Sequence, residues 1–347
     1  MTKSFKEISW LVDEPTYRAD KAYSYSTLSR FNREGFEKLD SLFESISTPS
    51  LTFGSMVDTM LTDGMEAFNL RFEVAALPEL SENLVQVART LFERYHETFH
   101  KLTDIPDMVI AAVGKDCGYY VADKYASYRT KMIKENCTEY YNILFQSLGK
   151  ELVSQAEYDK ACACVEALRT SPMTSWYFEA DSPFEEIERL YQLKFKGEYE
   201  GIPLRVMADL IICDSKNKIV YPCDLKTSSH REYEFPKSFI QYRYMIQAQL
   251  YWNIIRQNMD KDPVFKDYKL ADYRFIVVNN KDNFAPLVWE FSETRSEKDF
   301  TWGKNDQYSI PNWRKIVKEL DYYLTEKPQY PKFVTKLNSI TDYLKNE

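Results

Sequence analysis

The sequence predicts an α+β (α/β) fold in which helices flank a mixed β-sheet and a helical half precedes that sheet. The first observation is a change of apolar period, from helical spacing before about residue 183 to β-branched and aromatic runs after it. The second is a globular composition, with 44% hydrophobic and 15% aromatic residues in a chain of 347. Since no repeat or linker marks a boundary, we expect one compact unit.

Helical periodicity dominates the first half of the chain. It predicts five helices, over residues 26–39, 53–61, 84–102, 122–135 and 156–169. We therefore assign residues 1–182 to a helical N-terminal region that packs on the sheet.

Strand-like runs dominate the second half. They lie at residues 187–195, 204–213, 219–227, 273–279 and 286–291. A long helix is predicted over 239–257, between the third and fourth strands, because apolar and aromatic residues recur there at helical spacing. Residues 183–300 form the predicted core, and 301–347 form a helical tail with a helix over 312–324 and a shorter one after it.

The charge balance narrows the range of partners. The formal net charge of −8 argues against a protein that binds nucleic acid through a broad basic surface. No run approaches the roughly 18 consecutive apolar residues of a membrane span, and the N-terminus lacks the apolar segment of a signal peptide. We expect a cytoplasmic protein without a membrane partner.

Residues 204–227 predict a β-hairpin that carries the candidate catalytic side chains. Two apolar runs flank the polar residues 214–218. If residues 215–218 form the loop, Asp214 pairs with Ile219 and Asp209 lies opposite Asp224. Lys226 then points to the same face as Asp224, because it is two residues further along the strand.

Two opposed, half-buried carboxylates destabilise a sheet unless something neutralises them. A bound cation would do so, and oxygen ligands favour Mg²⁺ or Mn²⁺ over zinc. Lys226 beside the metal would orient or deprotonate a water, or stabilise negative charge on a phosphodiester. The alternative is an ion pair in which Lys226 only neutralises Asp224, and spacing alone leaves both interpretations open.

The hairpin motif, Asp209 followed by Asp224-Leu225-Lys226, resembles that of the PD-(D/E)XK nucleases. The similar branch contains the RecB-type nuclease domain, lambda exonuclease and exonuclease VIII. Three flanking segments follow the order of that branch: 23–31 is similar to its serine-containing opening helix, 51–61 to its G-x-x-x-H helix and 247–251 to its Q-x-x-x-Y helix. The resemblance spans roughly residues 23–292.

The resemblance implies a restriction-endonuclease-like fold and a Mg²⁺- or Mn²⁺-dependent deoxyribonuclease. It suggests an exonuclease that acts on single- or double-stranded DNA in phage recombination or DNA processing, in the host cytoplasm if the chain is phage-encoded. The resemblance allows two kinds of protein partner: a recombination or annealing protein, and a second copy of this chain.

The resemblance also implies roles for individual residues. Asp209 and Asp224 would bind the metal, the carbonyl of Leu225 would add a ligand, and Lys226 would be catalytic. Glu188 is a further expected ligand, because pairing of 187–195 with 204–213 places it on the Asp209 face.

Other implied residues come from the flanking segments. Asp58 stands where the family has histidine, so it would ligate a hard cation but cannot act as an imidazole. Gly54, one turn earlier, would permit close approach of a helix or of DNA. The remaining candidates for DNA binding or active-site support are Gln247, Tyr251, Ser26 and Arg30, with helix–sheet packing as the alternative for Gln247 and Tyr251.

Two other functions compete with nuclease activity. His96, Glu97 and His100 form an H-E-x-x-H pattern, which in a zinc peptidase places two histidines one helical turn apart. Charged neighbours Arg94 and Lys101 argue for a solvated helix face instead. A nuclease fold that binds DNA or a protein without cutting is the other alternative, and the missing histidine favours it.

Overall fold

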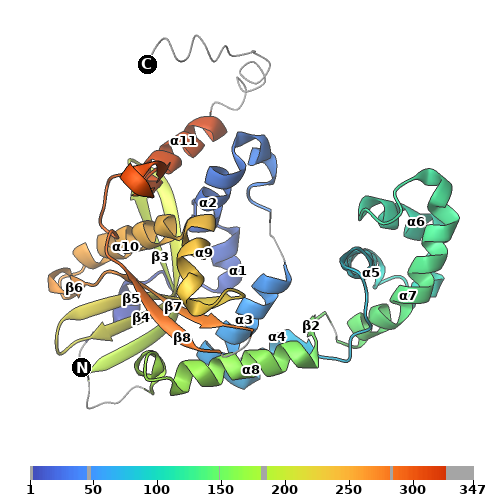
Figure 1. Ribbon diagram of the computed structural model, residues 1–347, viewed down its shortest axis with the longest axis horizontal. Coiled ribbons are helices and arrows are strands. Elements are labelled where there is room, and N and C mark those ends of the chain that lie inside the picture. The colour runs from blue at the N-terminus through green and yellow to red at the C-terminus, as the bar shows by residue number, and fades with distance from the viewer. Residues whose placement is uncertain (1–2, 45–47, 148, 181–185, 282–283, 326–347) are drawn as a thin grey trace, which may run out of the picture. The chain divides into compact units, whose positions relative to one another are not determined.

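A computed structural model describes residues 3–44, 48–147, 149–180, 186–281 and 284–325 (Figure 1). The chain divides into two compact units, a sheet unit of Met1–Thr48 with Ala167–Glu347 and a helical unit of Pro49–Glu166. This division differs from the predicted single unit with a boundary near residue 183. The first 48 residues belong to the sheet unit because their helix α2 (Tyr25–Glu34) packs against α10 (Tyr244–Asp260) and α11 (Trp313–Thr325).

The sheet unit is built on a mixed sheet, as the sequence predicts. Its strand order is β3-β4-β5-β7-β8, and the short β6 pairs with β5. Only the β5–β7 and β5–β6 pairs are parallel; the other neighbours in this sheet run antiparallel. The strands are β3 (Ile187–Tyr199), β4 (Ile202–Asp214), β5 (Ile219–Ser228), β6 (Lys269–Leu270), β7 (Tyr273–Asn279) and β8 (Pro286–Phe291).

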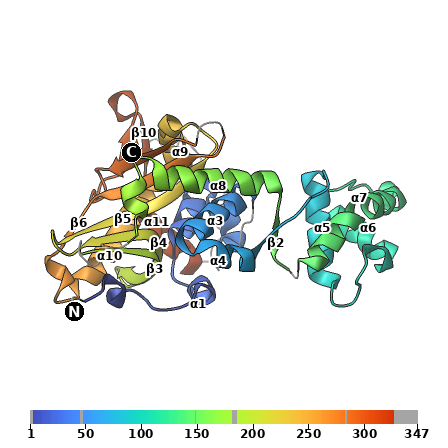
Figure 2. The ribbon, with the colours of Figure 1, turned by 90° about the horizontal axis from the view of Figure 1, so that it is seen from below.

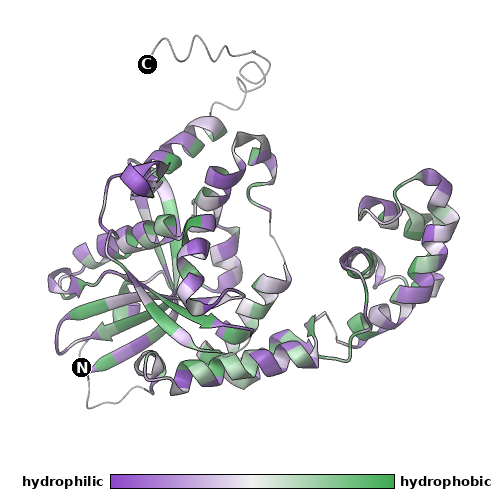
Figure 3. Cartoon of the chain, viewed as in Figure 1, coloured by the Kyte–Doolittle hydropathy of each residue, from purple (hydrophilic) through white to green (hydrophobic). Residues whose placement is uncertain are grey.

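One long helix, α10, covers a face of this sheet. It packs on β3, β4 and β7, and α2, α9 (Phe235–Gln241) and α11 pack against it in turn. Buried residues such as Phe195, Val206, Ile254, Phe275 and Trp313 form the core between these layers. Figure 3 shows the apolar composition of the central strands.

The predicted continuous helix over 239–257 is wrong, because the structure breaks it into α9 and α10. Arg243, at the start of α10, adopts a left-handed backbone with φ of 64°. An α-helix cannot continue through such a residue, so the apolar period runs across two helices that meet at an angle.

The helical unit contains a second core. Helices α5, α6 and α7 pack together through buried residues that include Val87, Leu91, Ile110, Ile133 and Tyr141. Figure 2 shows α3 and α4 beside α8, where the rings of Phe68 and Tyr158 lie 5.5 Å apart. The elements are α3 (Pro49–Thr62), α4 (Gly64–Arg71), β1 (Phe72–Val74), α5 (Glu82–Tyr95), α6 (Asp107–Asp116), α7 (Ala126–Gln146), β2 (Glu151–Val153) and α8 (Gln155–Thr170), which runs on into the sheet unit.

Shorter elements complete the chain. They are α1 (Glu14–Ala19), the strands β9 (Phe300–Trp302) and β10 (Tyr308–Ile310), and the 3-10 helices η1 (Phe5–Ile8), η2 (Phe36–Ser41), η3 (Leu102–Asp104), η4 (Asp123–Tyr125), η5 (Ser175–Phe178), η6 (Glu232–Glu234), η7 (Phe265–Asp267) and η8 (Lys304–Asp306). The predicted tail helix is confirmed as α11, and the final short helix falls outside the described residues. In the part of the chain that the structure describes, no helix has the length and hydropathy to cross a bilayer.

Gly197 on β3 allows α10 to approach the sheet closely. A Cβ atom there would lie 2.6 Å from Gln257 Oε1 and 2.7 Å from Ile254 Cδ1. We predict that Gly197→Val lowers the free energy of unfolding by about 1–3 kcal/mol in denaturant titrations, because it overpacks the contact. The same change at exposed Glu198 is the control, with an expected effect within about 0.5 kcal/mol.

Candidate active site

The β4–β5 hairpin has the predicted register. Asp214 pairs with Ile219, and the ladder continues to the pair of Leu210 with Cys223. The ladder ends at that pair, and Asp209 and Asp224 are the next residues on the two strands. Asp209 Oδ2 accepts a hydrogen bond from the backbone N–H of Leu225 at 3.0 Å, so the Asp209 side chain reaches the neighbouring strand.

The alternation of side chains between the two faces of β4 shifts by one residue at Asp209. Val206 and Ala208 lie in the core that includes α10, and so do Ile211 and Cys213. In a regular strand, even- and odd-numbered residues face opposite sides of the sheet. The alternation therefore shifts by one residue between Ala208 and Ile211, as at a β-bulge.

The same alternation shifts in β3, beside Asp209. Leu193 and Phe195 lie in that core, Leu190 packs against it, and Gln192 between them has a left-handed φ of 52°. Gln192 is the residue that would oppose Asp209, but the ladder passes from Tyr191–Leu210 directly to Leu193–Ala208. The two strands thus kink together beside Asp209.

Asp224 is almost completely buried, with a side chain 1% exposed. Its Oδ1 accepts a hydrogen bond from Gln247 Nε2 on α10 at 2.5 Å. Its Oδ2 lies 2.5 Å from Lys226 Nζ but receives no well-directed hydrogen bond from the described residues. Each carboxylate oxygen is therefore next to a different side chain.

Lys226 lies between the Asp224 carboxylate and the ring of Tyr244. Its side chain is 18% exposed, and Nζ is 4.7 Å from the ring centroid of Tyr244. Burial by itself lowers the pKa of Lys226, but electrostatic interactions with Asp224, Tyr244 and Asp209 raise it, and the net pKa lies above the usual lysine value. The side chain is thus a cation at neutral pH.

The donors at this site fit a hard cation. Asp209, Asp224 and the carbonyl of Leu225 are oxygen donors, and Mg²⁺ is usually held by one or two carboxylates with waters and substrate phosphates. Oδ2 of the buried Asp224 accepts no hydrogen bond from the described residues, so its lone pairs can coordinate such a cation. Across the described residues, no third Asp, Glu, His or Cys joins them in a metal-binding cluster.

The structure contradicts the expectation that Glu188 joins this site. Glu188 pairs with Cys213, four residues beyond Asp209 on β4, or roughly 13 Å along the strand. Its carboxylate binds the Ser4 hydroxyl and the Phe5 N–H at the start of η1. The alternation of side chains along a strand predicted which face of the sheet Glu188 occupies, but not how far along the strand it lies.

Gly54 and Asp58 lie on α3, in the helical unit. The Asp209 and Asp224 carboxylates belong to the sheet unit. Metal binding by Asp58 therefore stays a prediction. So does the close approach of a helix or of DNA at Gly54.

Helix α10 brings Gln247 to the site and uses Tyr251 for packing. Gln247 binds Asp224 directly, which is the support of the hairpin that the sequence predicts. Tyr251 is buried, and its ring meets that of Tyr273 edge to face at 6.0 Å. Helix–sheet packing, the alternative for Tyr251, is thus the role that the structure shows.

Of the two α2 candidates, Arg30 has a structural role. Its Nη1 donates to the backbone carbonyls of Leu42 and Glu44 at 3.0 and 3.1 Å, and its Nε lies 3.5 Å from Glu34. These contacts hold the segment after η2 against α2, and a DNA contact of Arg30 stays a prediction. Ser26 is exposed, and its role stays a prediction.

Sequence reasoning did not assign Gln192 or Tyr244 to the site. Gln192 had a detectable signal, because the apolar residues Leu190 and Leu193 are three positions apart in a strand whose period is two. Tyr244 had none: its spacing is that of an ordinary buried helix face, and only the packing of α10 places its ring beside Lys226.

The zinc-peptidase alternative is wrong. Helix α5 ends at Tyr95, and residues 96–100 form a turn and a bend instead of a helix. The two histidines therefore do not lie one helical turn apart. The ring of His96 stacks on Phe92 at 4.7 Å, and that of His100 lies 5.0 Å from Phe145.

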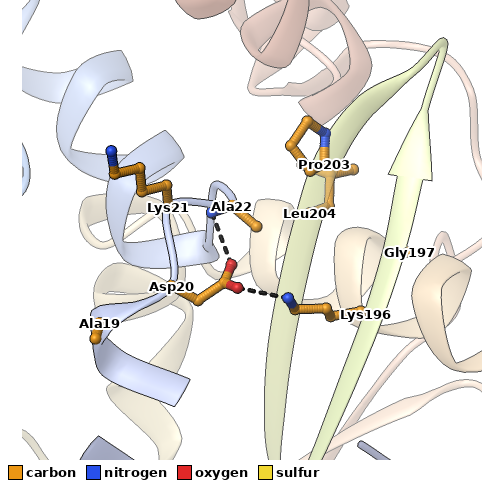
Figure 4. A pocket seen from close by; sticks show the side chains of 8 residues that line it. All are labelled: Ala19, Asp20, Lys21, Ala22, Lys196, Gly197, Pro203 and Leu204. Atoms are coloured by element: carbon orange, nitrogen blue, oxygen red, sulfur yellow. Dashed lines mark hydrogen bonds and ion pairs between the residues drawn. The ribbon is translucent and has the colours of Figure 1, made fainter. Parts of the chain in front are cut away.

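A surface pocket lies elsewhere in the sheet unit, between the end of α1 and strands β3 and β4 (Figure 4). Its lining contains an ion pair, in which Asp20 Oδ2 is 2.5 Å from Lys196 Nζ. Because these two charges neutralise each other, we assign no chemistry to this pocket. Its lining residues are Ala19, Asp20, Lys21, Ala22, Lys196, Gly197, Pro203 and Leu204.

No protein-family model and no curated protein matches the chain. Among solved structures, it is similar to a crystal structure from Eubacterium rectale named "Putative exonuclease". The identity is 13%, the match covers 94% of this chain and 89% of that chain, and the TM-score is 0.45. We draw no functional conclusion from a likeness at this level, and the interpretation of the site depends on its own residues.

The left-handed backbone at Gln192 gives a testable stability difference. We predict that Gln192→Gly unfolds at higher denaturant than Gln192→Ala, by about 1 kcal/mol, because a Cβ atom is unfavourable at positive φ. Lys194 on the same strand is the control, where alanine should be more stable than glycine by about 0.5–1 kcal/mol. The same order of stability at both positions would contradict the kink.

Proposed function

We propose that the protein is a Mg²⁺- or Mn²⁺-dependent deoxyribonuclease that hydrolyses phosphodiester bonds. The observation that carries this proposal is the meeting of Asp209, Asp224 and Lys226 on adjacent strands of one hairpin. That it is an exonuclease, acting in phage recombination or DNA processing, is proposed from the motif resemblance alone.

Asp209, Asp224 and the Leu225 carbonyl are the groups that would hold the cation, with Asp58 as a further proposed ligand. When bound, such a cation polarises the scissile phosphate and lowers the pKa of a coordinated water. Gln247 orients the Asp224 carboxylate through its hydrogen bond to Oδ1. Asp224 Oδ2 then faces Lys226 and would be the oxygen available to a cation.

Lys226 supplies positive charge in this proposal. Its ammonium lies next to Asp224, partly shielded from water by Tyr244, where an electrostatic contact is stronger than at the surface. A cation in this position stabilises the negative charge that develops on a phosphodiester during attack by water.

Two isosteric changes test the roles of the residues. We expect Asp224→Asn and Lys226→Met each to lower metal-dependent cleavage of linear DNA by at least about a hundredfold, measured as release of labelled nucleotides. Melting curves should show that each variant is folded, since removing one member of a buried ion pair also lowers stability. Glu188→Gln is the matched control and should cleave within about threefold of the wild type, because Glu188 lies away from the site. Undiminished cleavage by folded Asp224→Asn and Lys226→Met proteins would refute the proposal.

Removing the metal tests the cofactor. We expect cleavage of linear single- or double-stranded DNA with Mn²⁺ and none with EDTA, because the charge of the scissile phosphate needs the cation. Cleavage that persists in EDTA would contradict a metal-dependent mechanism. DNA that is bound but left uncut in every metal would instead identify the non-cutting binding module that the replacement of histidine by Asp58 favours.

A further inference from the structure

Two arginines lie together where helix α2 meets the turn between α9 and α10. Arg33 is in the last turn of α2, and Arg243 is the residue on which α10 begins. Among the described residues, no carboxylate lies within 4.0 Å of either guanidinium. Other arginines of the sheet unit, such as Arg256 and Arg274, do have such partners.

Local contacts hold the two side chains in place. Arg243 Nε donates to Asn32 Oδ1 at 2.9 Å, and its Nη1 donates to the Ile240 carbonyl at 2.5 Å. Arg33, the residue after Asn32, donates from Nε to the Ser29 carbonyl at 3.2 Å. A guanidinium has five N–H groups, so both arginines keep donors for a ligand.

The two positive charges act on each other. Burial lowers the pKa of Arg243, and the nearby charge of Arg33 lowers it further. Neighbouring like charges repel each other, and an anion between them removes the repulsion. The protein supplies none within ion-pair distance among the described residues, whereas a phosphate would.

Tyrosine side chains connect this arginine pair to the candidate active site. Tyr25 Oη donates to the Tyr242 carbonyl, next to Arg243, at 2.6 Å. The ring of Tyr25 lies 6.3 Å from that of Tyr244, which in turn lies 4.7 Å from Lys226 Nζ. These contacts connect the arginine pair to Lys226 through Tyr25 and Tyr244.

We propose that Arg33 and Arg243 together bind a backbone phosphate of the DNA strand, next to the phosphate at Asp209, Asp224 and Lys226. Guanidinium groups match phosphate oxygens in paired hydrogen bonds, which favours this ligand over a carboxylate at a nuclease site. The inference rests on the proposed function. The competing interpretation is that both arginines only hold α2 against the α9–α10 turn.

The test measures binding of a labelled single-stranded oligonucleotide in EDTA, where no cleavage is expected, over a series of salt concentrations. The variants are Arg33→Gln and the double variant Arg33→Gln/Arg243→Asn, since asparagine tolerates the left-handed backbone. Lys237→Gln is the matched control: it removes one positive charge from an exposed side chain of α9, but that ammonium is paired with Glu234 at 2.7 Å.

We expect Arg33→Gln to weaken binding about tenfold and to lower the slope of log K against log salt by about 0.7, the value for one phosphate contact on a single strand. The double variant should lower the slope by about 1.4, and Lys237→Gln should change it little. If wild type binds DNA and the double variant keeps its affinity and slope, the proposal is overturned, even if the variant melts at a lower temperature.

If the protein is not a nuclease, the binding experiment gives a different result. If wild type binds no oligonucleotide, the nuclease assignment fails, and inorganic phosphate becomes the probe for the arginine pair. A rise in melting temperature with phosphate in wild type that is absent in the double variant supports a phosphate site. An equal response of both proteins overturns it.

Discussion

The buried carboxylate of Asp224 is the group on which this structure depends most. An ionised carboxylate that is 1% exposed is tolerated only when charged and hydrogen-bonding partners surround it. Lys226 on the same strand supplies the charge, and Gln247 on α10 supplies the hydrogen bond. These contacts join the hairpin to its covering helix, so the position of α10 and the chemistry of the site are set by the same interaction.

The kink at Gln192 and Asp209 is the second constraint on the site. In an unbroken β4, the residues before and after Asp209 could not both pack their apolar side chains beneath α10. The phase shift resolves this conflict, and it lets the Asp209 carboxylate turn to the backbone of Leu225. The fold thereby places the Asp209 carboxylate between strand residues that pack in the apolar core.

The net charge of −8 agrees with local recognition of an anion. Positive charge gathers at Arg33 and Arg243, while surface pairs such as Lys237 with Glu234 neutralise each other. A protein organised in this way would engage a strand of DNA at one place, and its affinity would depend on few phosphate contacts.

The sequence by itself determined the strands and the hairpin register, because period-two apolar runs and a short polar loop are local signals; Asp209, Asp224 and Lys226 follow from them. Only the tertiary structure decided which other residues take part. Glu188 shares the predicted face but lies too far along its strand, and Arg243, where the predicted helix breaks, bonds to Asn32 of α2. Such long-range contacts leave no period in the chain, so local reasoning could not find them.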